Sequence, residues 1–287
     1  MDILLNKVSY IYDEGTSYEK CALAGVDLEV VQGEFIGLIG RTGSGKSTLV
    51  RLFNGLLKPT YGGVYVDGQD IADPDYSLSK LRGRVGLVFQ YPEQQLFEST
   101  VIADVQFGPN NQGLDKLTCE MRAYQALKTV GIGEELIDVP PLQLSGGQKR
   151  RVAIAGVLAM QPEVLILDEP TAGLDPGGRE DIFSLLHTLN EKNITIILIS
   201  HSMEDVAEHT SRVIVMNDGR IAMDGATEDV FTRYDELLGN GLKIPVASRV
   251  MAALEERGSI PAGQHKSVIR KDQIVELIRR TNKGDQL

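Results

Sequence analysis

The segment FIGLIGRTGSGKS, residues 35–47, joins an apolar run to a glycine-rich loop that ends in lysine and serine. The run FIGLIG (35–40) is typical of a buried strand that leads into a turn. Apolar residues then recur at helical spacing and predict a helix with one face in the core; they are Leu49, Leu52, Phe53 and Leu56. A strand, this loop and a helix, in this order, are the context in which the pattern G-x-x-x-x-G-K-S binds phosphate groups.

The residue types of the loop suit a nucleotide. Gly40, Gly43 and Gly45 allow backbone N–H groups to turn toward a polyphosphate, and the following helix adds its positive N-terminus. We expect Lys46 to reach the β and γ phosphates and the Ser47 hydroxyl to bind Mg²⁺. The loop residues expected to contact the nucleotide are Gly40, Arg41, Thr42, Gly43, Ser44, Gly45, Lys46, Ser47 and Thr48. By itself, the motif predicts only nucleotide binding.

Further apolar runs predict more buried strands. They are VGLVF (85–89), VLILD (164–168), ITIILIS (194–200) and VIVM (213–216). Residues 179–190, between two of these runs, have the pattern of a helix. Strands that alternate with helices predict an α/β fold with a parallel sheet covered on both faces.

Polar residues suited to phosphoryl transfer follow three of the predicted strands. Asp168 ends the run VLILD at the carboxyl edge, where open α/β sheets bind ligands, and can hold Mg²⁺ through water. Glu169 is the candidate base that orients the attacking water. His201 and Gln90 occupy corresponding places after their own strands. The predicted catalytic residues are Lys46, Gln90, Glu169 and His201, and the predicted metal ligands are Ser47, Gln90 and Asp168.

Two regions differ from this pattern. From about residue 100 to 145 no strong strand is predicted, and Leu117, Met121, Tyr124 and Leu127 line one helical face, so we expect a helical insertion. After about residue 226, two further helical faces are predicted around the loop GSIPAGQ (258–264); they are Val246, Val250, Ala253 and Leu254, then Ile274, Leu277 and Ile278. We interpret this end as a helical pair that packs on the domain or on another subunit.

Composition limits the class of protein. The chain has 287 residues and a formal net charge of -11, which argues against a protein that wraps nucleic acid. Cys21 and Cys119 show no metal-ligand spacing, and we interpret them as structural. The longest apolar run, 194–199, is far shorter than the roughly 20 residues that span a bilayer. We therefore expect a cytoplasmic chain that reaches a membrane only through a partner.

A second anion-binding turn lies in LSGGQ (144–148). Ser145 and the N–H groups of Gly146 and Gly147 stand at the start of a predicted helix, 148–160. Together with GRTGSGKS, Gln90, LILDEP, AGLDP (172–176) and His201, in sequence order, this segment resembles the ATPase subunit of ABC transporters over about residues 1–225. The resemblance implies two cassettes bound head to tail, in which the SGGQ turn of one closes over the γ phosphate of ATP held by the other.

This resemblance implies roles for particular residues. Ser145, Gly146, Gly147 and Gln148 would act on the nucleotide of the partner, and Asp175 would lie at the subunit interface. Tyr12 occupies the place of the aromatic residue that stacks on adenine. A tyrosine simply packed on a strand is the competing interpretation of Tyr12, because Tyr10 is two residues away.

Longer segments are similar to the ATPases of energy-coupling-factor transporters, which import vitamins and metal ions in prokaryotes. These segments are FQYPEQQLFESTV (89–101), FGPNNQG (107–113) and residues 144–176, and they look most like the second of two sister ATPases. The resemblance implies a cassette (1–225) with a helical subdomain (about 100–150), and a C-terminal helical extension (226–287). It also implies a sister ATPase in a heterodimer or homodimer, a transmembrane coupling protein, a substrate-binding membrane protein, and a place at the cytoplasmic face of the membrane.

Two other functions remain open from the sequence. A soluble ATPase with the same cassette could act in macromolecular or cluster assembly, although no long coiled coil and no second cassette is present. A nucleotide-binding regulator that does not hydrolyse ATP is disfavoured by the intact set of Lys46, Gln90, Asp168, Glu169 and His201.

We expect the segment 91–101, with its apolar pair Leu96-Phe97, to pass motion to a membrane partner.

Overall fold

The computed structural model describes residues 1–258, 260 and 268–275. A six-stranded sheet, in the order β10-β9-β3-β8-β7-β6, forms its centre. The strands are β3 (Phe35–Gly40), β6 (Val85–Val88), β7 (Val164–Asp168), β8 (Thr195–Ile199), β9 (Arg212–Asn217) and β10 (Arg220–Ala226). All neighbours pair in parallel except β10, which is antiparallel to β9. The prediction of a parallel sheet from five apolar runs is confirmed.

A second, antiparallel sheet was not predicted. Its order is β2-β1-β4-β5, with β1 (Ile3–Tyr12), β2 (Lys20–Val30), β4 (Tyr61–Val66) and β5 (Gln69–Asp70). The pairing of β1 with β2 shifts register between Leu5 and Val8 and again between Val8 and Tyr10. Each shift interrupts the alternation of buried and exposed residues, so the period-two pattern of a strand is hard to recognise in the sequence.

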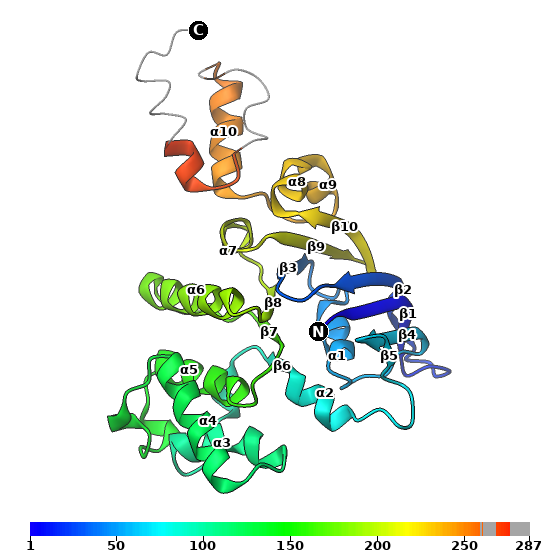
Figure 1. Cartoon of the computed structure of the whole chain (residues 1–287). Coiled ribbons are helices and arrows are strands. Elements are labelled where there is room, and N and C mark those ends of the chain that lie inside the picture. Colours follow the sequence, from blue (N-terminus) through cyan, green and yellow to red (C-terminus); the bar gives the residue numbers. More distant parts are fainter. Residues whose placement is uncertain (259, 261–267, 276–287) are drawn as a thin grey trace.

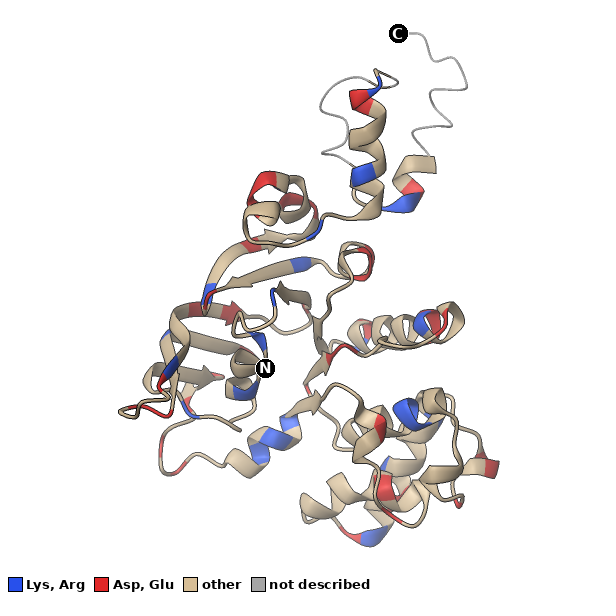
Figure 2. Ribbon diagram, turned by 180° about the vertical axis from the view of Figure 1, so that it is seen from behind, with Lys and Arg blue, Asp and Glu red and all other residues tan. Residues whose placement is uncertain are grey.

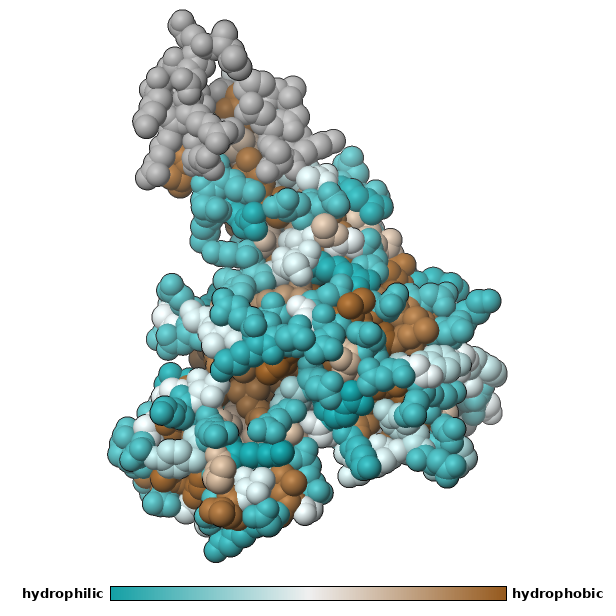
Figure 3. All heavy atoms as spheres, in the orientation of Figure 1, coloured by the Kyte–Doolittle hydropathy of each residue, from teal (hydrophilic) through white to brown (hydrophobic). Residues whose placement is uncertain are grey.

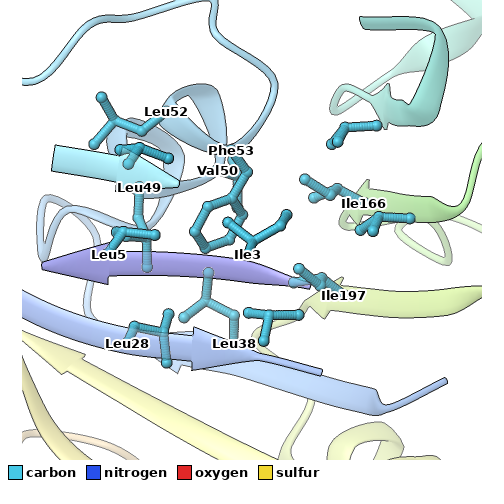
Figure 4. Packing of buried hydrophobic residues seen from close by; sticks show 14 of the residues in the cluster. Ile3, Leu5, Leu28, Leu38, Leu49, Val50, Leu52, Phe53, Ile166 and Ile197 are labelled. Carbon is cyan, nitrogen blue, oxygen red and sulfur yellow. The ribbon is translucent and has the colours of Figure 1, made fainter. Parts of the chain in front are cut away.

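Helix α1 (Lys46–Phe53) packs between the two sheets (Figures 1 and 4). Its buried side chains Leu49, Leu52 and Phe53 share one core with Ile3 and Leu5 of β1, and central-sheet residues such as Leu38, Ile166 and Ile197 join the same core. The helix ends at Phe53, so Leu56 lies beyond it and is 45% exposed. This face of the sheet is thus covered by α1 and the second sheet.

Helices cover the other face of the central sheet. Alternate strand residues such as Leu165, Leu167 and Leu198 point into a second core, with α6 (Pro176–Glu191) and three further helices. Those three are α3 (Val101–Asn111), α4 (Lys116–Thr129) and α5 (Gly146–Leu158). The helical segment in the middle of the chain therefore exists as predicted, and Figure 1 shows it at the opposite end of the molecule from the C-terminal helices.

The apolar face predicted for α4 is largely wrong. Leu117 and Met121 are 66% and 54% exposed, and only Leu127 of that face is buried. The core-facing side chains of α4 are instead Cys119, Ala123, Ala126 and Leu127. Small residues take the inner face because α4 packs closely against α3 and α5.

Short elements connect and extend these layers. They are α2 (Leu78–Arg84), α7 (Met203–His209), α8 (Thr227–Thr232), α9 (Tyr234–Gly239), α10 (Val246–Glu256), and the 3₁₀ turns η1 (Pro92–Gln95), η2 (Glu134–Leu136) and η3 (Pro141–Gln143). In α10 the predicted inner residues Val246 and Val250 are more than 40% exposed, and Ala247, Ser248 and Met251 are buried instead. Leu277 and Ile278 lie outside the described residues, as does most of the predicted 258–264 loop. In the part of the chain that the structure describes, no helix combines the length and apolarity needed to cross a bilayer.

Candidate functional site: a phosphate loop and two carboxylates at one sheet edge

The phosphate loop lies between the end of β3 and the start of α1. Gly40 has φ 155°, and a Cβ there would approach the carbonyl oxygen of Met216 to 2.4 Å. Gly45 precedes the helix with φ 105°, in the region open to glycine. The loop thus takes its shape from glycine, and the N–H groups of the first helical turn face the loop without intrahelical partners.

Lys46 is held inside this loop. Its Nζ donates hydrogen bonds to the carbonyl oxygens of Gly40 (2.7 Å) and Arg41 (3.0 Å), and the residue is 7% exposed. Burial lowers the pKa of Lys46, while the negative charges of Asp168 and Glu169 act in the opposite direction. The ammonium group therefore lies near both carboxylates, beside the backbone that would surround a phosphate.

Asp168 and Glu169 leave the central sheet beside the loop. Asp168 ends β7 and pairs in register with Ile199 of β8. Glu169 follows with φ 52°, an uncommon conformation for a residue with a side chain, and its N–H donates to the Ile199 carbonyl oxygen at 2.9 Å. This hydrogen bond fixes the turn that directly follows β7.

The Glu169 carboxyl has an oxygen that can accept a hydrogen bond from a ligand. Its Oε1 is buried and has no hydrogen-bond partner among the described residues, and it lies 3.9 Å from Nε2 of His201. Burial raises the pKa of Glu169, and the nearby His201 opposes this shift. Burial likewise raises the pKa of Asp168, against the opposing charge of Lys46. Unpartnered buried oxygens are rare in native proteins, so a water or a nucleotide is the natural partner of Glu169.

Other predicted residues approach the same edge. Gln90 follows β6, which neighbours β7, and His201 follows β8, so parallel pairing brings both to the carboxyl edge that carries Asp168. Ser47 is the second residue of α1 and is exposed, as is Gln90. A hydroxyl, an amide and one carboxylate are the hard oxygen ligands that suit Mg²⁺ alongside phosphates. Among the described residues no cluster of three His, Cys, Asp or Glu could bind a metal by itself.

Ser44 and Tyr12 place two further polar groups beside the phosphate loop. The Ser44 Oγ is buried inside the loop and has no hydrogen-bond partner in the part of the chain that the structure describes. The Tyr12 hydroxyl lies 3.2 Å from Thr48 Oγ1 on α1, while its ring meets Tyr10 edge-on at 4.8 Å between centroids. Tyr12 is therefore adjacent to the phosphate loop and also packed on its strand, and its stacking on adenine stays a prediction.

The SGGQ turn lies on a different element from the phosphate loop. Ser145 caps α5, where its Oγ accepts from Gln148 N–H at 3.3 Å and Gln148 Oε1 accepts from Ser145 N–H at 2.9 Å. Helix α5 packs on α3, α4, η1 and β6, whereas α1 packs on β2 and β3. A Cβ at Gly146 or Gly147 would meet nothing within 4 Å, so packing within this chain does not require glycine there.

Asp175 caps the next helix in the same manner. Its carboxylate accepts from Gly178 N–H at 2.7 Å, and the residue is exposed at the start of α6. The structure therefore separates the predicted residues into two groups: one around the phosphate loop, and one exposed at the starts of α5 and α6.

Sequence reasoning missed two ion pairs near this site, of which the pair formed by Arg150 is the more buried. Arg150 of α5 pairs with Glu93 at 3.3 Å, and Arg179 of α6 pairs with Asp205 of α7 at 2.6 Å. A signal was present for the first pair, because Arg150 shares a helical stripe with the buried residues Ile154 and Leu158. A charged residue on an apolar stripe indicates a buried ion pair.

The fold and the order of these motifs define an ATP-binding cassette. The profile of the ABC transporter family matches residues 23–172, slightly more than half of the chain. The chain therefore belongs to the ABC transporter family, as its ATP-binding and ATP-hydrolysing cassette.

Proteins of similar sequence indicate which kind of ABC ATPase this chain resembles. The energy-coupling factor transporter ATP-binding protein EcfA2 of Caldanaerobacter subterraneus subsp. tengcongensis is 47% identical across 98% of this chain and 99% of the relative. The EcfA2 protein of Symbiobacterium thermophilum is 51% identical across 97% and 96%. The resemblance to energy-coupling-factor ATPases is thus confirmed.

Solved structures agree with this placement. The structure of cbiO1 from Clostridium perfringens, described as part of the ABC transporter complex cbiONQ, is similar with a TM-score of 0.72 and 41% identity, covering 88% of this chain and 98% of that one. The dimeric ATP-binding cassette MJ0796 bound to ADP and Pi has a TM-score of 0.70 and 33% identity, covering 78% and 98%. The predicted fold class is confirmed.

Proposed function

We propose that this chain powers an energy-coupling-factor importer as one of two cassettes bound head to tail, on the cytoplasmic face of the membrane. The chain binds and hydrolyses ATP, and its EcfA2 relatives are ATP-binding proteins of such transporters. One observation carries the proposal of two cassettes. The phosphate loop and the SGGQ turn belong to separate elements, and a Cβ at either glycine of the turn would meet nothing within 4 Å among the described residues. Each motif is then half of a site that only a second cassette completes.

Hydrolysis follows from the arrangement at the sheet edge. The loop N–H groups and Lys46 hold the β and γ phosphates and neutralise part of their charge. The buried Glu169 Oε1 accepts a hydrogen bond from the attacking water and takes its proton as the γ phosphoryl group is transferred, which leaves ADP and phosphate. His201, 3.9 Å from this oxygen, is placed to contact the γ phosphate.

Mg²⁺ is the metal that these residues suit. Ser47, Gln90 and Asp168 would hold it, and the bound ion would offset the charge that develops on the phosphate oxygens. We propose that Tyr12 stacks on adenine, and that Ser145, Gly146, Gly147 and Gln148 contact the γ phosphate of the partner. Asp175 would then lie between the two cassettes.

A groove supports the docking of a transmembrane partner. A cavity of about 550 Å³ opens between α2, η1, α3 and α5, and its apolar lining includes Leu96, Phe97, Phe107 and Met160. Phe97 is 63% and Phe107 46% exposed, with ring centroids 5.0 Å apart. Apolar residues are visible among polar ones over these lower helices in Figure 3, and Figure 2 shows basic positions along α2. We propose that an apolar helix of the coupling protein enters this groove.

We propose a cassette of residues 1–225 with a helical subdomain at about 100–150, and an extension, 226–287, that contacts another subunit. The sister ATPase is a different chain in this proposal, and a substrate-binding membrane protein selects the vitamin or metal ion.

Purification of the tagged chain from gently solubilised native membranes tests the proposal. We expect a second cassette ATPase and small polytopic membrane proteins to be recovered with it, identified by mass spectrometry. The same chain should hydrolyse ATP in that complex. Recovery from the soluble fraction alone, with ribosomal, DNA-bound or cluster-assembly proteins, would overturn the transport function and leave the ATPase chemistry in place.

A further inference from the structure

Arg150 is a buried cation on the second turn of the helix that carries the SGGQ turn. It is 5% exposed, and it lies on the inner stripe of α5 with Ile154 and Leu158. A buried guanidinium is unfavourable unless hydrogen bonds and an opposite charge compensate for its lost hydration. Its partners therefore show what this charge is held for.

The partners of Arg150 come from two segments outside its own helix. Nε and one terminal nitrogen each lie 3.3 Å from the Glu93 carboxylate of η1. The other terminal nitrogen donates to the carbonyl oxygens of Pro170 (3.1 Å) and Ala172 (2.6 Å). One planar group thus joins α5, η1 and the segment that follows β7.

Each joined segment leads directly to a functional surface. Glu93 is followed by Gln95, Leu96 and Phe97, which line the docking groove. Pro170 and Ala172 are one and three residues after Glu169, and the Ala172 N–H closes the turn by donating to the Glu169 carbonyl oxygen at 3.2 Å.

The geometry suits transmission of movement between these surfaces. Glu169 is held with φ 52°, so its side-chain direction depends on the turn that Arg150 fixes from the other side. The guanidinium offers its donors in a fixed plane, so a shift of Glu93 rotates or displaces the whole group. A lysine has one flexible ammonium and cannot bridge both segments with the same geometry.

We propose that Arg150 is a positioning residue that links the docking groove to Glu169: when a partner moves η1, the guanidinium moves the turn that aims the Glu169 carboxylate. The proposal rests on the proposed function. It adds that the coupling passes through Glu93 and Arg150 inside one chain, in addition to any movement of whole cassettes.

A double-mutant cycle in the purified membrane complex, reconstituted in nanodiscs, tests this link. The variants are Glu93→Gln, Arg150→Gln, their combination, and Arg150→Lys, with kcat and KM measured for Mg-ATP. We expect each single variant to lower kcat about tenfold, because a small misplacement of a catalytic group has effects of this size. The KM should stay within about twofold, because the phosphate loop lies on other elements.

The combined variant distinguishes a link from two independent contacts. If the two residues act in series, Glu93→Gln adds almost nothing to the loss caused by Arg150→Gln. The matched control is Arg151→Gln, at the next position. The Arg151 guanidinium forms a long ion pair, 3.7 Å, with the exposed carboxylate of Asp181. We expect this control to keep kcat within about twofold of the wild type, since an exposed ion pair contributes little.

Several results would overturn the proposal. They are multiplied losses in the double variant, an equal loss in Arg151→Gln, or a KM that rises in step with the fall in kcat. Arg150→Lys keeps a positive charge beside Glu93 and guards against a folding defect, so an unchanged kcat in this variant also contradicts the link. A wild-type complex without ATP hydrolysis would instead remove the proposed function, and this proposal with it.

Discussion

At the residue scale, Glu169 combines features that rarely occur together in one side chain. It has a left-handed φ of 52°, a buried oxygen without a partner, and a pKa raised by burial. Local strain and an unsatisfied oxygen both reduce stability, so a folded protein keeps them where function requires them. This combination supports the role of general base more strongly than the sequence motif alone.

Glu169→Gln should abolish turnover and retain ATP binding. The amide has nearly the same shape as the carboxyl but cannot accept the proton of the attacking water, so we expect kcat to fall about 10²-fold or more. Phosphate release in single-turnover experiments measures this loss, and filter binding measures the retained ATP. Lys46→Ala is the contrasting variant, because it should weaken nucleotide binding. Undiminished hydrolysis in Glu169→Gln would remove this residue from the mechanism.

His209 should make stability fall as the pH falls. Its ring stacks on Phe183 at 3.7 Å and its Nδ1 lies 3.0 Å from Nε2 of His187. Burial, followed by the charge of His187, lowers the pKa of His209 from 6.5 to about 4. Between these two values the unfolded chain binds a proton that the folded chain excludes, so this contribution is absent above pH 6.5 and destabilises the folded state increasingly down to about pH 4.

The comparison of wild type with His209→Gln isolates this effect. Glutamine stays neutral across the window, so the variant lacks this source of pH dependence while the carboxylates of the chain titrate in both proteins. Between pH 7 and 5 we expect the melting temperature of the wild type to fall about 2–4 °C more than that of the variant. Equal falls in the two proteins would show that His209 titrates normally.

At the element scale, the start of α5 has glycines that packing within the described part of this chain does not explain. Its capping box satisfies the helix end within the chain, yet two glycines follow where no neighbour requires them. Glycine destabilises a helix relative to alanine, so its presence here has a local energetic cost. The open surface that results is the one a second cassette would contact.

Gly147→Ala should therefore stabilise the chain and inactivate the assembled ATPase. The added methyl meets nothing within 4 Å, so we expect a gain of about 0.5 kcal/mol in unfolding free energy from helix propensity. In the cassette pair the same methyl would occupy the space of the partner's phosphate, and we expect ATPase activity to fall about tenfold. Gly239→Ala in α9, also open, is the control for the stability gain alone. Full ATPase activity in Gly147→Ala would contradict a contact between this turn and the nucleotide of a second cassette.

Elements also show where sequence patterns were sufficient. Each of the five apolar runs became a strand of the central sheet, because a buried strand needs only a short apolar segment between turns. The inner face of α4 could not be predicted in this way. Its large apolar residues Leu117 and Met121 face outward, and three of the four residues on the inner face are small, because α4 packs closely against α3 and α5.

At the scale of the whole molecule, one helix joins the SGGQ turn to the groove between α2, η1, α3 and α5. Helix α5 carries the SGGQ turn at its start and groove residues such as Val157 farther along. The C-terminal helices lie at the opposite end of the molecule from this groove (Figure 1). The groove and the C-terminal helices are thus on different surfaces of the molecule.

Leu96→Ala combined with Phe97→Ala should release the chain from its membrane partner. The two substitutions remove apolar area from the groove, so we expect recovery of the transmembrane protein with the tagged chain to fall about tenfold. The purified variant chain should still bind ATP. The matched control is Leu117→Ala with Met121→Ala, which removes similar exposed apolar area on α4. Unchanged recovery with the groove variant, or an equal loss with the control, would place the contact elsewhere.

The sequence by itself determined the phosphate loop, the parallel strands and the polar residues at their ends, because these depend on local spacing and on glycine. Asp168, Glu169 and His201 needed only their positions after strands to be assigned to one edge. The tertiary structure alone decided the antiparallel sheet around α1, the outward face of α4, and the contacts of Arg150 with Glu93, Pro170 and Ala172. These features join residues far apart in the chain, and only packing in three dimensions selects which distant groups meet.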